Sequence, residues 1–265
     1  MTWKTVLYEK RDRVALITLN RPDVLNALSP DLTEELTEAL REAEADSGVG
    51  CLLVTGAGRA FSAGGDMAMF RQGLEGRAAL PLDKLYGLVD TLFHLKKPTV
   101  AAINGPAIGG GATVSLHFDI RIASEQARFA FMFPRVGLVP ELGSTFLLPH
   151  IVGFARAMEL VLTSRTVDAQ EALALGLVTR VVPAEALMEE AMSLARELAH
   201  GPTRTLARAK EVLQRGVQGD LQTAFRFEQE VLGYCLSSPE HREGIAAFLE
   251  KRQPRWVEIS EGQAG

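Results

Sequence analysis

Two glycine-rich segments carry the residues of this chain that are best suited to chemistry. Residues 60–67 (AFSAGGDM) and 105–112 (GPAIGGGA) each follow a short apolar run. Small residues let a ligand approach the backbone closely, and the first N–H groups of a following helix have no intrahelical acceptor. Two such loops side by side direct two N–H donors at one oxygen, which stabilises an oxyanion or an enolate. Either loop taken alone is also explained as a tight turn.

One carboxylate, Glu141, lies in a separate segment, residues 137–145 (GLVPELGST). The preceding Pro140 is typical of the first position of a helix, which predicts that Glu141 lies in the first helical turn. In that position it either complements the helix dipole or accepts a proton during catalysis. Asp66 and Asp119 are also acidic and near the loops, and we interpret both as structural caps.

The sequence lacks the residues that several other kinds of catalytic site require. The second loop is not followed by the Lys-Ser/Thr pair of a P-loop, neither loop matches G-x-G-x-x-G, and no serine lies in a G-x-S-x-G elbow. The five histidines have no metal-ligand spacing, and the two cysteines, Cys51 and Cys235, are too few for a cysteine metal site or a disulfide framework. We therefore expect no bound metal.

The elements that must position these groups alternate between strand and helix. A hairpin opens the chain, and Ser29 followed by Pro30 predicts the start of an amphipathic helix. Continuous apolar runs indicate strands buried on both faces of a sheet covered by helices. From about residue 153 the pattern is mostly helical. The predicted strands are residues 6–9, 14–19, 51–55, 99–103 and 120–123.

Composition limits the class of protein. The 265 residues, 47% of them hydrophobic, suffice for one substantial core, which we expect as an α/β part over residues 1–190 with a helical part over 191–265. A formal net charge of −5 with interspersed signs argues against a nucleic-acid partner. No segment has the apolar core of a signal peptide or the roughly 20 apolar residues of a membrane span, so we expect a cytoplasmic protein without a membrane partner.

The motifs, in their order along the chain, resemble the crotonase superfamily of enoyl-CoA hydratases and isomerases. The resemblance implies a core of repeated ββα units and a helical C-terminal trimerisation region, with trimers that often pair into hexamers. The matching segments are residues 18–22 (TLNRP), 25–28 (LNAL), 61–66 (FSAGGD), 97–105 (KPTVAAING), 109–111 (GGG), 119–123 (DIRIA), 172–178 (ALALGLV), 243–244 (EG) and 247–252 (AFLEKR).

The same resemblance implies where an acyl-CoA substrate binds. The backbone N–H groups of Gly65 and Gly110 would hold the thioester oxygen. Phe248 and Lys251 match positions that often contact the CoA of a neighbouring subunit, although Lys251 is also explained as part of a solvated helix face. CoA belongs to the substrate, so no separate cofactor is implied. The residues expected near the CoA are Asn26, Ala27, Ala63, Asp66 and Met67.

The catalytic side chains decide which reaction follows. A hydratase of this superfamily carries two glutamates that hold and activate water, and the corresponding positions here are Thr113 and Phe133. The two-glutamate hydration site is therefore missing. Glu141 instead matches the position of the catalytic acid in Δ3,Δ2-enoyl-CoA isomerases and related ring-opening isomerases.

The resemblance thus implies that Glu141 takes a proton from C2 of a 3-enoyl-CoA and returns it at C4. Phe133, Leu138 and Leu142 would exclude water and raise the pKa of the glutamate, while Thr113 would be part of the pocket wall. Residues 70–81 should help to shape the acyl pocket, but their sequence has no clear pattern. The alternatives are a hydratase or another lyase that obtains water differently, and a CoA-binding homologue without turnover.

Overall fold

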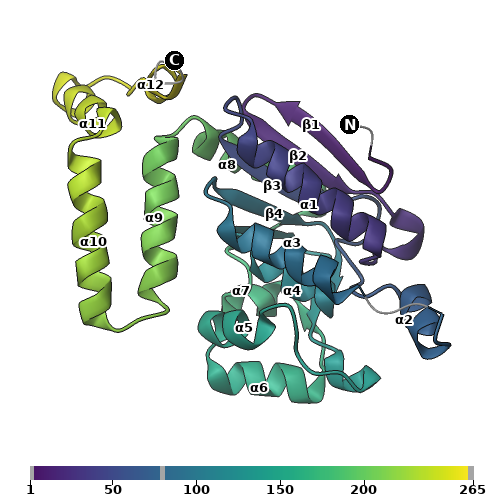
Figure 1. The fold of residues 1–265 in the computed structure, drawn as a ribbon. Helices are drawn as coiled ribbons and strands as arrows, with labels where there is room; N and C mark the ends of the chain where they lie inside the picture. The colour runs from purple at the N-terminus through teal and green to yellow at the C-terminus, as the bar shows by residue number, and fades with distance from the viewer. Residues whose placement is uncertain (1–2, 78–80, 262–265) are drawn as a thin grey trace.

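The computed structural model describes residues 3–77 and 81–261, and its centre is a six-stranded sheet in the order β1-β2-β3-β4-β6-β9 (Figure 1). β1 and β2 pair antiparallel through Asp12 and Arg13, which both adopt the left-handed backbone angles of a two-residue hairpin turn. The remaining neighbours in this sheet are parallel. The strands are β1 Val6–Arg11, β2 Val14–Leu19, β3 Cys51–Gly56, β4 Thr99–Ile103, β6 Ile120–Ser124 and β9 Arg180–Val182.

Helices cover both faces of this sheet. α1 (Pro30–Ala45) and α3 (Leu82–His94) share the core of one face, and α8 (Leu187–Ala199) packs on the other. Every residue of β3 is buried, as the continuous apolar run predicted for a strand between two helical layers. The predicted α/β class and the predicted cap of α1 by Ser29 are therefore confirmed.

A second, three-stranded sheet consists of β5 (Pro106–Ile108), β7 (Arg128–Ala130) and β8 (Val167–Asp168). Two isolated parallel bridges extend it, one between Ser62 and Ala107 and one between Leu28 and Gly65. Three segments that are distant in sequence therefore run side by side, and two of them are the glycine-rich loops.

Shorter helices connect these layers, and Met67–Leu74 (α2) covers part of the tract expected to shape the acyl pocket. Residues 78–80 of that tract lie outside the described residues. The remaining short elements are η1 Pro22–Val24, α4 Gly110–Leu116, η2 Phe133–Val136, α5 Ser144–Val152, α6 Phe154–Thr163, α7 Ala169–Leu175 and η3 Ala184–Ala186.

The C-terminal helices form an arm that projects from the α/β body (Figure 1). The boundary expected after residue 190 falls inside α8, which belongs to the core because it packs on the sheet; the arm begins at Thr203. The arm comprises α9 Thr203–Gly216, α10 Leu221–Leu236, α11 Pro239–Glu250 and α12 Trp256–Glu261.

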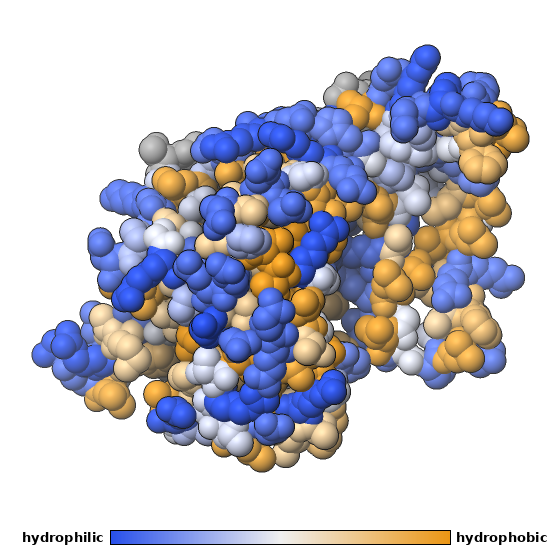
Figure 2. All heavy atoms as spheres, turned by 180° about the vertical axis from the view of Figure 1, so that it is seen from behind, coloured by the Kyte–Doolittle hydropathy of each residue, from blue (hydrophilic) through white to orange (hydrophobic). Residues whose placement is uncertain are grey.

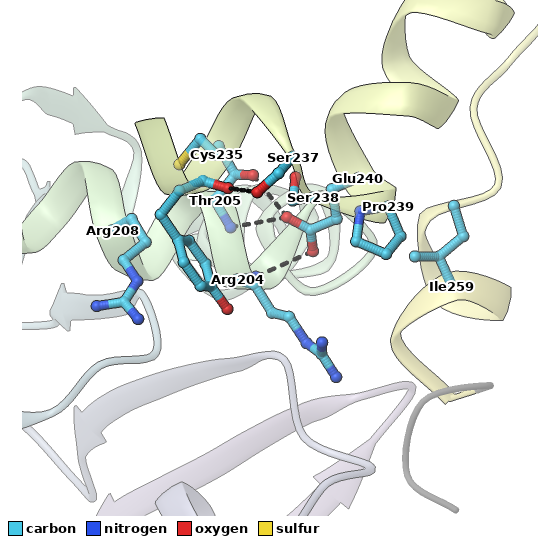
Figure 3. Close-up of a pocket in the computed structure, with 10 residues that line it drawn as sticks. Arg204, Thr205, Arg208, Cys235, Ser237, Ser238, Pro239, Glu240 and Ile259 are labelled. Atoms are coloured by element: carbon cyan, nitrogen blue, oxygen red, sulfur yellow. Dashed lines mark hydrogen bonds between the residues drawn. The ribbon is translucent and has the colours of Figure 1, made fainter. Parts of the chain in front are cut away.

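A buried carboxylate joins two helices of the arm (Figure 3). Glu240, near the start of α11, is only 3% exposed. It accepts hydrogen bonds from the backbone N–H groups of Arg204 and Thr205 and from the Thr205 hydroxyl, at 3.1, 2.8 and 2.6 Å. Glu240 therefore caps the N-terminus of α9 from another helix, since these first N–H groups have no intrahelical acceptor.

Apolar side chains gather on the outside of the arm, which lies at the right of Figure 2. Contiguous exposed apolar surface of this kind marks a contact face in soluble proteins. The largest exposed apolar side chains of α9 and α10 are Leu213, Leu221, Phe225, Leu232, Tyr234 and Leu236.

Candidate active site

The two glycine-rich loops contact each other through their backbones. Ile108 N–H of the second loop donates to Ser62 O of the first at 2.9 Å. In addition, Leu28 N–H, from the segment before α1, donates to Gly64 O at 2.7 Å. A Cβ on Gly64 would overlap Ile108 O and would lie 3.1 Å from Gly110 N, and Gly64 has a φ of +84°. Only glycine permits this approach, so the sequence at Gly64 fixes the distance between the loops.

The loops present two backbone donors at this contact. Gly110 is the first residue of α4, a position whose N–H has no intrahelical acceptor. Gly65 N–H donates no hydrogen bond to any of the described residues, whereas the N–H of Gly64 is bound by Ser62 Oγ at 3.2 Å. The ring of Phe70 covers Gly65. Donors with these properties are suited to hold one developing oxyanion.

The carboxylate of Glu141 faces the second loop. Its Oε1 lies 3.9 Å from the position that a Cβ on Gly110 would occupy, and δ-methyl groups of Leu28 and Leu142 lie 3.2 and 3.7 Å from the same position. Burial raises the pKa of this carboxyl above its ordinary value, and nothing in the described chain donates a hydrogen bond to it. The structure therefore brings Gly64, Gly110 and a potential proton acceptor together.

The local structure around Glu141 differs from the prediction. Glu141 lies before α5 rather than in its first turn, because Leu142 and Gly143 adopt left-handed backbone angles of φ +54° and +86° that no helix accommodates. Ser144 donates to Glu141 O through its N–H and its hydroxyl, at 3.0 and 2.8 Å, and α5 starts there. A tight turn just before α5 carries the carboxylate, so the prediction that Glu141 lies in the first helical turn is wrong.

The positions expected to form the pocket wall differ in burial. Thr113 is fully buried on α4, where its hydroxyl lies 3.4 Å from Gly109 O, and Phe133 is 4% exposed. Leu138 is 39% exposed and Leu142 only 1%. Of the apolar residues expected around Glu141, Phe133 and Leu142 are therefore buried and Leu138 is exposed.

Asn26 and Ala27 belong to the scaffold of the site. The Asn26 side chain is fully buried; its Oδ1 accepts from Arg21 N–H at 2.8 Å, and its Nδ2 donates to the carbonyls of Ala57 and Ala60 at 3.0 and 2.8 Å. Ala27 O accepts from the Arg21 guanidinium at 2.7 Å. These hydrogen bonds inside the protein give Asn26 and Ala27 a structural role, and their contact with CoA stays a prediction.

Asp66 caps α2, which confirms its interpretation as a structural cap. It accepts from Ala68 N–H at 2.9 Å and forms an ion pair with Arg21 at 2.8 Å. Burial alone would raise the pKa of Asp66, but the hydrogen bonds from Arg21 and Ala68 outweigh it and lower the pKa. Ala63 is half-buried, and Met67 is 68% exposed.

Sequence reasoning missed Arg21 as a site residue. It connects residues 26–27 to Asp66, and so it holds the first loop to the segment after β2. The signal was present in the matched TLNRP segment, but nothing local predicts a partner 45 residues away. Asp119 is also structural: it accepts from the N–H and hydroxyl of Thr99 and from Lys210 Nζ, all within 2.9 Å.

Phe248 and Lys251 lie at the end of α11, on the arm, and Phe248 is 81% exposed. Figure 1 places α11 at the opposite end of the molecule from α2. Within one chain these two residues do not reach the loops.

An apolar hollow of about 580 Å³ adjoins the Glu141 turn. α3 and α5 line it, together with Leu142, Gly143 and His117.

In the described part of the chain, no group of three or more His, Cys, Asp or Glu side chains is arranged to hold a metal ion. No helix among the described residues is long and apolar enough to cross a membrane.

Comparisons with known proteins agree with this architecture. The sequence model of the enoyl-CoA hydratase/isomerase family matches residues 9–259. The chain is 37% identical over 257 residues to the short-chain-enoyl-CoA hydratase of Clostridium acetobutylicum. This match covers 96% of this chain and 97% of that protein. It is 38% identical over 248 residues to the 1,2-epoxyphenylacetyl-CoA isomerase of Escherichia coli, and the match covers 92% of this chain and 95% of that protein. A solved enoyl-CoA hydratase from Bacillus anthracis is similar with a TM-score of 0.90, at 33% identity and coverages of 96% and 99%.

Proposed function

This chain belongs to the enoyl-CoA hydratase/isomerase family, and we propose that it is a Δ3,Δ2-enoyl-CoA isomerase in which Glu141 moves the proton. Membership of the family makes it an acyl-CoA-processing enzyme with the crotonase fold. The observation that carries the finer proposal is the carboxylate of Glu141, which faces Gly110 within 3.9 Å of the position of an added Cβ.

In the proposed reaction, the thioester oxygen accepts hydrogen bonds from the N–H groups of Gly65 and Gly110, which acidifies the protons on C2. Glu141 removes one of these protons, and the electron pair moves toward the thioester oxygen to give a dienolate. The same carboxyl then returns the proton to C4. The double bond moves from C3–C4 to C2–C3, where it conjugates with the carbonyl. One residue suffices because the reaction has no net gain or loss of protons.

The surroundings of Glu141 support this role. The apolar side chains of Leu28 and Leu142 approach the same position over Gly110 as the carboxylate does, and burial raises the pKa of Glu141. A base with a raised pKa holds an abstracted proton more readily near neutral pH than an exposed glutamate does. None of the described residues donates a hydrogen bond to the carboxylate, which leaves it available to the substrate.

Hydration is the second candidate, because several of the similar proteins are named enoyl-CoA hydratases. Activation of water by two carboxylates is the chemistry that a hydratase needs. The two positions that correspond to those carboxylates hold a buried threonine, Thr113, and a buried phenylalanine, Phe133. Neither side chain can act as a base, which favours the isomerase. The resemblance to an epoxyphenylacetyl-CoA isomerase supports a bond rearrangement as well.

The test is a direct assay of double-bond movement. Purified protein is added to a 3-enoyl-CoA, and the ultraviolet absorbance of the conjugated 2-enoyl thioester is followed. We expect a rise with the wild type, a loss of about 10²–10⁴-fold in kcat with Glu141→Gln, and no change with Glu189→Gln, an exposed control on α8. Consumption of 2-enoyl-CoA without any rise from 3-enoyl-CoA would instead assign a hydratase.

We further propose that the chain self-associates as a trimer or a dimer of trimers, so that Phe248 and Lys251 contact the CoA of a neighbour. The exposed apolar side chains of α9 and α10 support a covered face, and the distance of α11 from the loops of the same chain requires a second copy. Sedimentation equilibrium measures the mass. Lys251→Ala is expected to raise KM for the acyl-CoA with kcat unchanged, whereas a monomer with unaltered KM would contradict the proposal.

A further inference from the structure

His117 lies at the C-terminal end of the helix that begins with the proposed oxyanion donor. α4 runs from Gly110 to Leu116, and His117 caps it. Its Nε2 lies 2.8 Å from Leu142 O, the carbonyl of the residue that follows Glu141. One short helix therefore contacts both parts of the site: its first residue faces the Glu141 carboxylate, and its cap holds the turn that carries that carboxylate.

The turn needs such an anchor because its backbone is strained. Leu142 adopts a φ of +54°, which is unfavourable for a residue with a Cβ. Gly143 follows at φ +86°, and a Cβ there would lie 3.3 Å from two atoms of the His117 ring. The imidazole thus packs directly against the turn. Loss of its hydrogen bond would leave the carbonyl of the buried Leu142 without this donor.

The contact defines the tautomer of His117. Leu142 O can only accept, so Nε2 carries the hydrogen. Nδ1 is buried and has no partner among the described residues. Burial lowers the pKa of His117, the hydrogen bond to Leu142 opposes that shift, and the charge of Arg121 adds to it. A protonated ring would place a second N–H where the described structure offers no acceptor.

The charged groups around the ring come from three elements. Arg121 on β6 donates to the carbonyls of Leu116 and Phe118, on either side of His117. Asp90 on α3 lines the same hollow as the ring, and Glu141 belongs to the turn itself.

We propose that His117 is a positioning residue: the Nε2–H hydrogen bond to Leu142 O fixes the turn so that the Glu141 carboxylate stays over Gly110. This inference rests on the proposed role of Glu141 as the proton carrier. His117 does not touch the reacting atoms, and it acts through the backbone between Glu141 and Gly143.

The test compares two substitutions of similar size. His117→Leu removes the donor, whereas His117→Gln keeps an amide N–H near the position of Nε2. A misplacement of about 1 Å costs roughly 10²-fold in rate, so we expect His117→Leu to lower kcat about 30- to 100-fold with KM within about 2-fold. His117→Gln is expected to stay within about 5-fold of the wild-type kcat. The unfolding midpoints of both variants identify any general loss of structure.

The proposal is overturned if His117→Leu keeps the wild-type kcat, or if the two variants lose kcat equally while remaining folded. Crystal structures of the wild type and both variants give a readout that is independent of turnover. The carboxylate of Glu141 should leave Gly110 in the leucine variant only. An inactive wild type would count against the isomerase alone, whereas an unmoved carboxylate in His117→Leu would count against the positioning role alone.

Discussion

Gly64 and Gly110 are in direct backbone contact, so that a methyl group added to Gly64 would lie 3.1 Å from Gly110 N. The two residues belong to different loops and are 46 positions apart in the sequence. Their contact holds the segment that contains Gly65 beside the start of α4, where Gly110 lies. The donor pair proposed for the thioester oxygen therefore depends on the absence of a side chain at Gly64, whose own N–H donates to Ser62 Oγ instead.

Substitution of Gly64 should disrupt this contact. Gly64→Ala adds a Cβ that overlaps Ile108 O, at a φ of +84° that alanine rarely adopts. We expect a loss of about 2–3 kcal/mol in the free energy of unfolding by urea, together with loss of activity. Gly87→Ala is the control, because an added Cβ there meets nothing within 4 Å inside α3. It should stabilise the protein slightly; equal effects of the two substitutions would contradict the backbone contact.

Substitution of Gly110 should separate activity from stability. An added Cβ meets only side-chain atoms: Leu28 at 3.2 Å, Leu142 at 3.7 Å and the Glu141 carboxylate at 3.9 Å. The methyl would occupy the space between the donor and the base. We expect Gly110→Ala to lower kcat/KM by about 100-fold or more, with a change in the free energy of unfolding below about 1 kcal/mol. Full activity in this variant would place the substrate elsewhere.

The pKa of Glu141 gives a pH dependence with a defined sign. Burial raises this pKa above the ordinary value of 4.5, so kcat/KM should fall as the pH falls through the raised value. The same shift destabilises the folded state once the group ionises, because the unfolded chain loses its proton at a lower pH. Glu141→Gln should therefore be more stable than the wild type at pH 7.5 but not at pH 4. Glu189→Gln should show no such difference, and the measurement is thermal unfolding at both pH values.

Much of the fold could be predicted from sequence because its signals are local. The apolar run of β3, the cap at Ser29 and the two glycine-rich loops each depend on neighbouring residues, and the structure confirms these elements. The C-terminal helices were also expected, but the boundary expected after residue 190 falls inside α8, whose amphipathic pattern fits either part.

The candidate site was only partly predictable. Glu141 could be singled out from the sequence. Pro140 indicated a helix there, which the left-handed backbone of Leu142 does not allow, and no local pattern predicts a left-handed leucine. Arg21 and His117 act through partners 45 and 25 residues away. Contacts at such separations follow from packing of the whole chain, which a single sequence does not display.

The buried ring of His117 should make the wild type sensitive to acid. Its folded pKa is lowered from the ordinary 6.5, so the unfolded chain binds a proton first as the pH falls. The contribution to stability is present above pH 6.5 and is lost as the pH falls toward the folded pKa. His117→Gln cannot take up this proton, so its stability should decline less than that of the wild type from pH 7 to pH 5. Parallel declines in chemical unfolding would show that His117 does not titrate in this window.

The arm gives the last prediction, because α9 starts at a carboxylate supplied by α11. Glu240 is 3% exposed and accepts from two backbone N–H groups and the Thr205 hydroxyl. Glu240→Ala leaves these donors without their acceptor, and we expect a loss of about 2–3 kcal/mol in the free energy of unfolding. Asp220→Ala, at the exposed cap of α10, is the control and should lose about 1 kcal/mol.

Amide hydrogen exchange locates the effect of Glu240→Ala. The first turn of α9 should exchange faster in this variant, while the strands of the central sheet keep their protection, because the arm projects from the body (Figure 1). If the arm also carries the contacts between subunits, the same variant should sediment at a lower mass. Unchanged exchange at Arg204 and Thr205 would mean that water replaces the carboxylate without loss of protection in α9. Glu240 would then not hold α9 and α11 together.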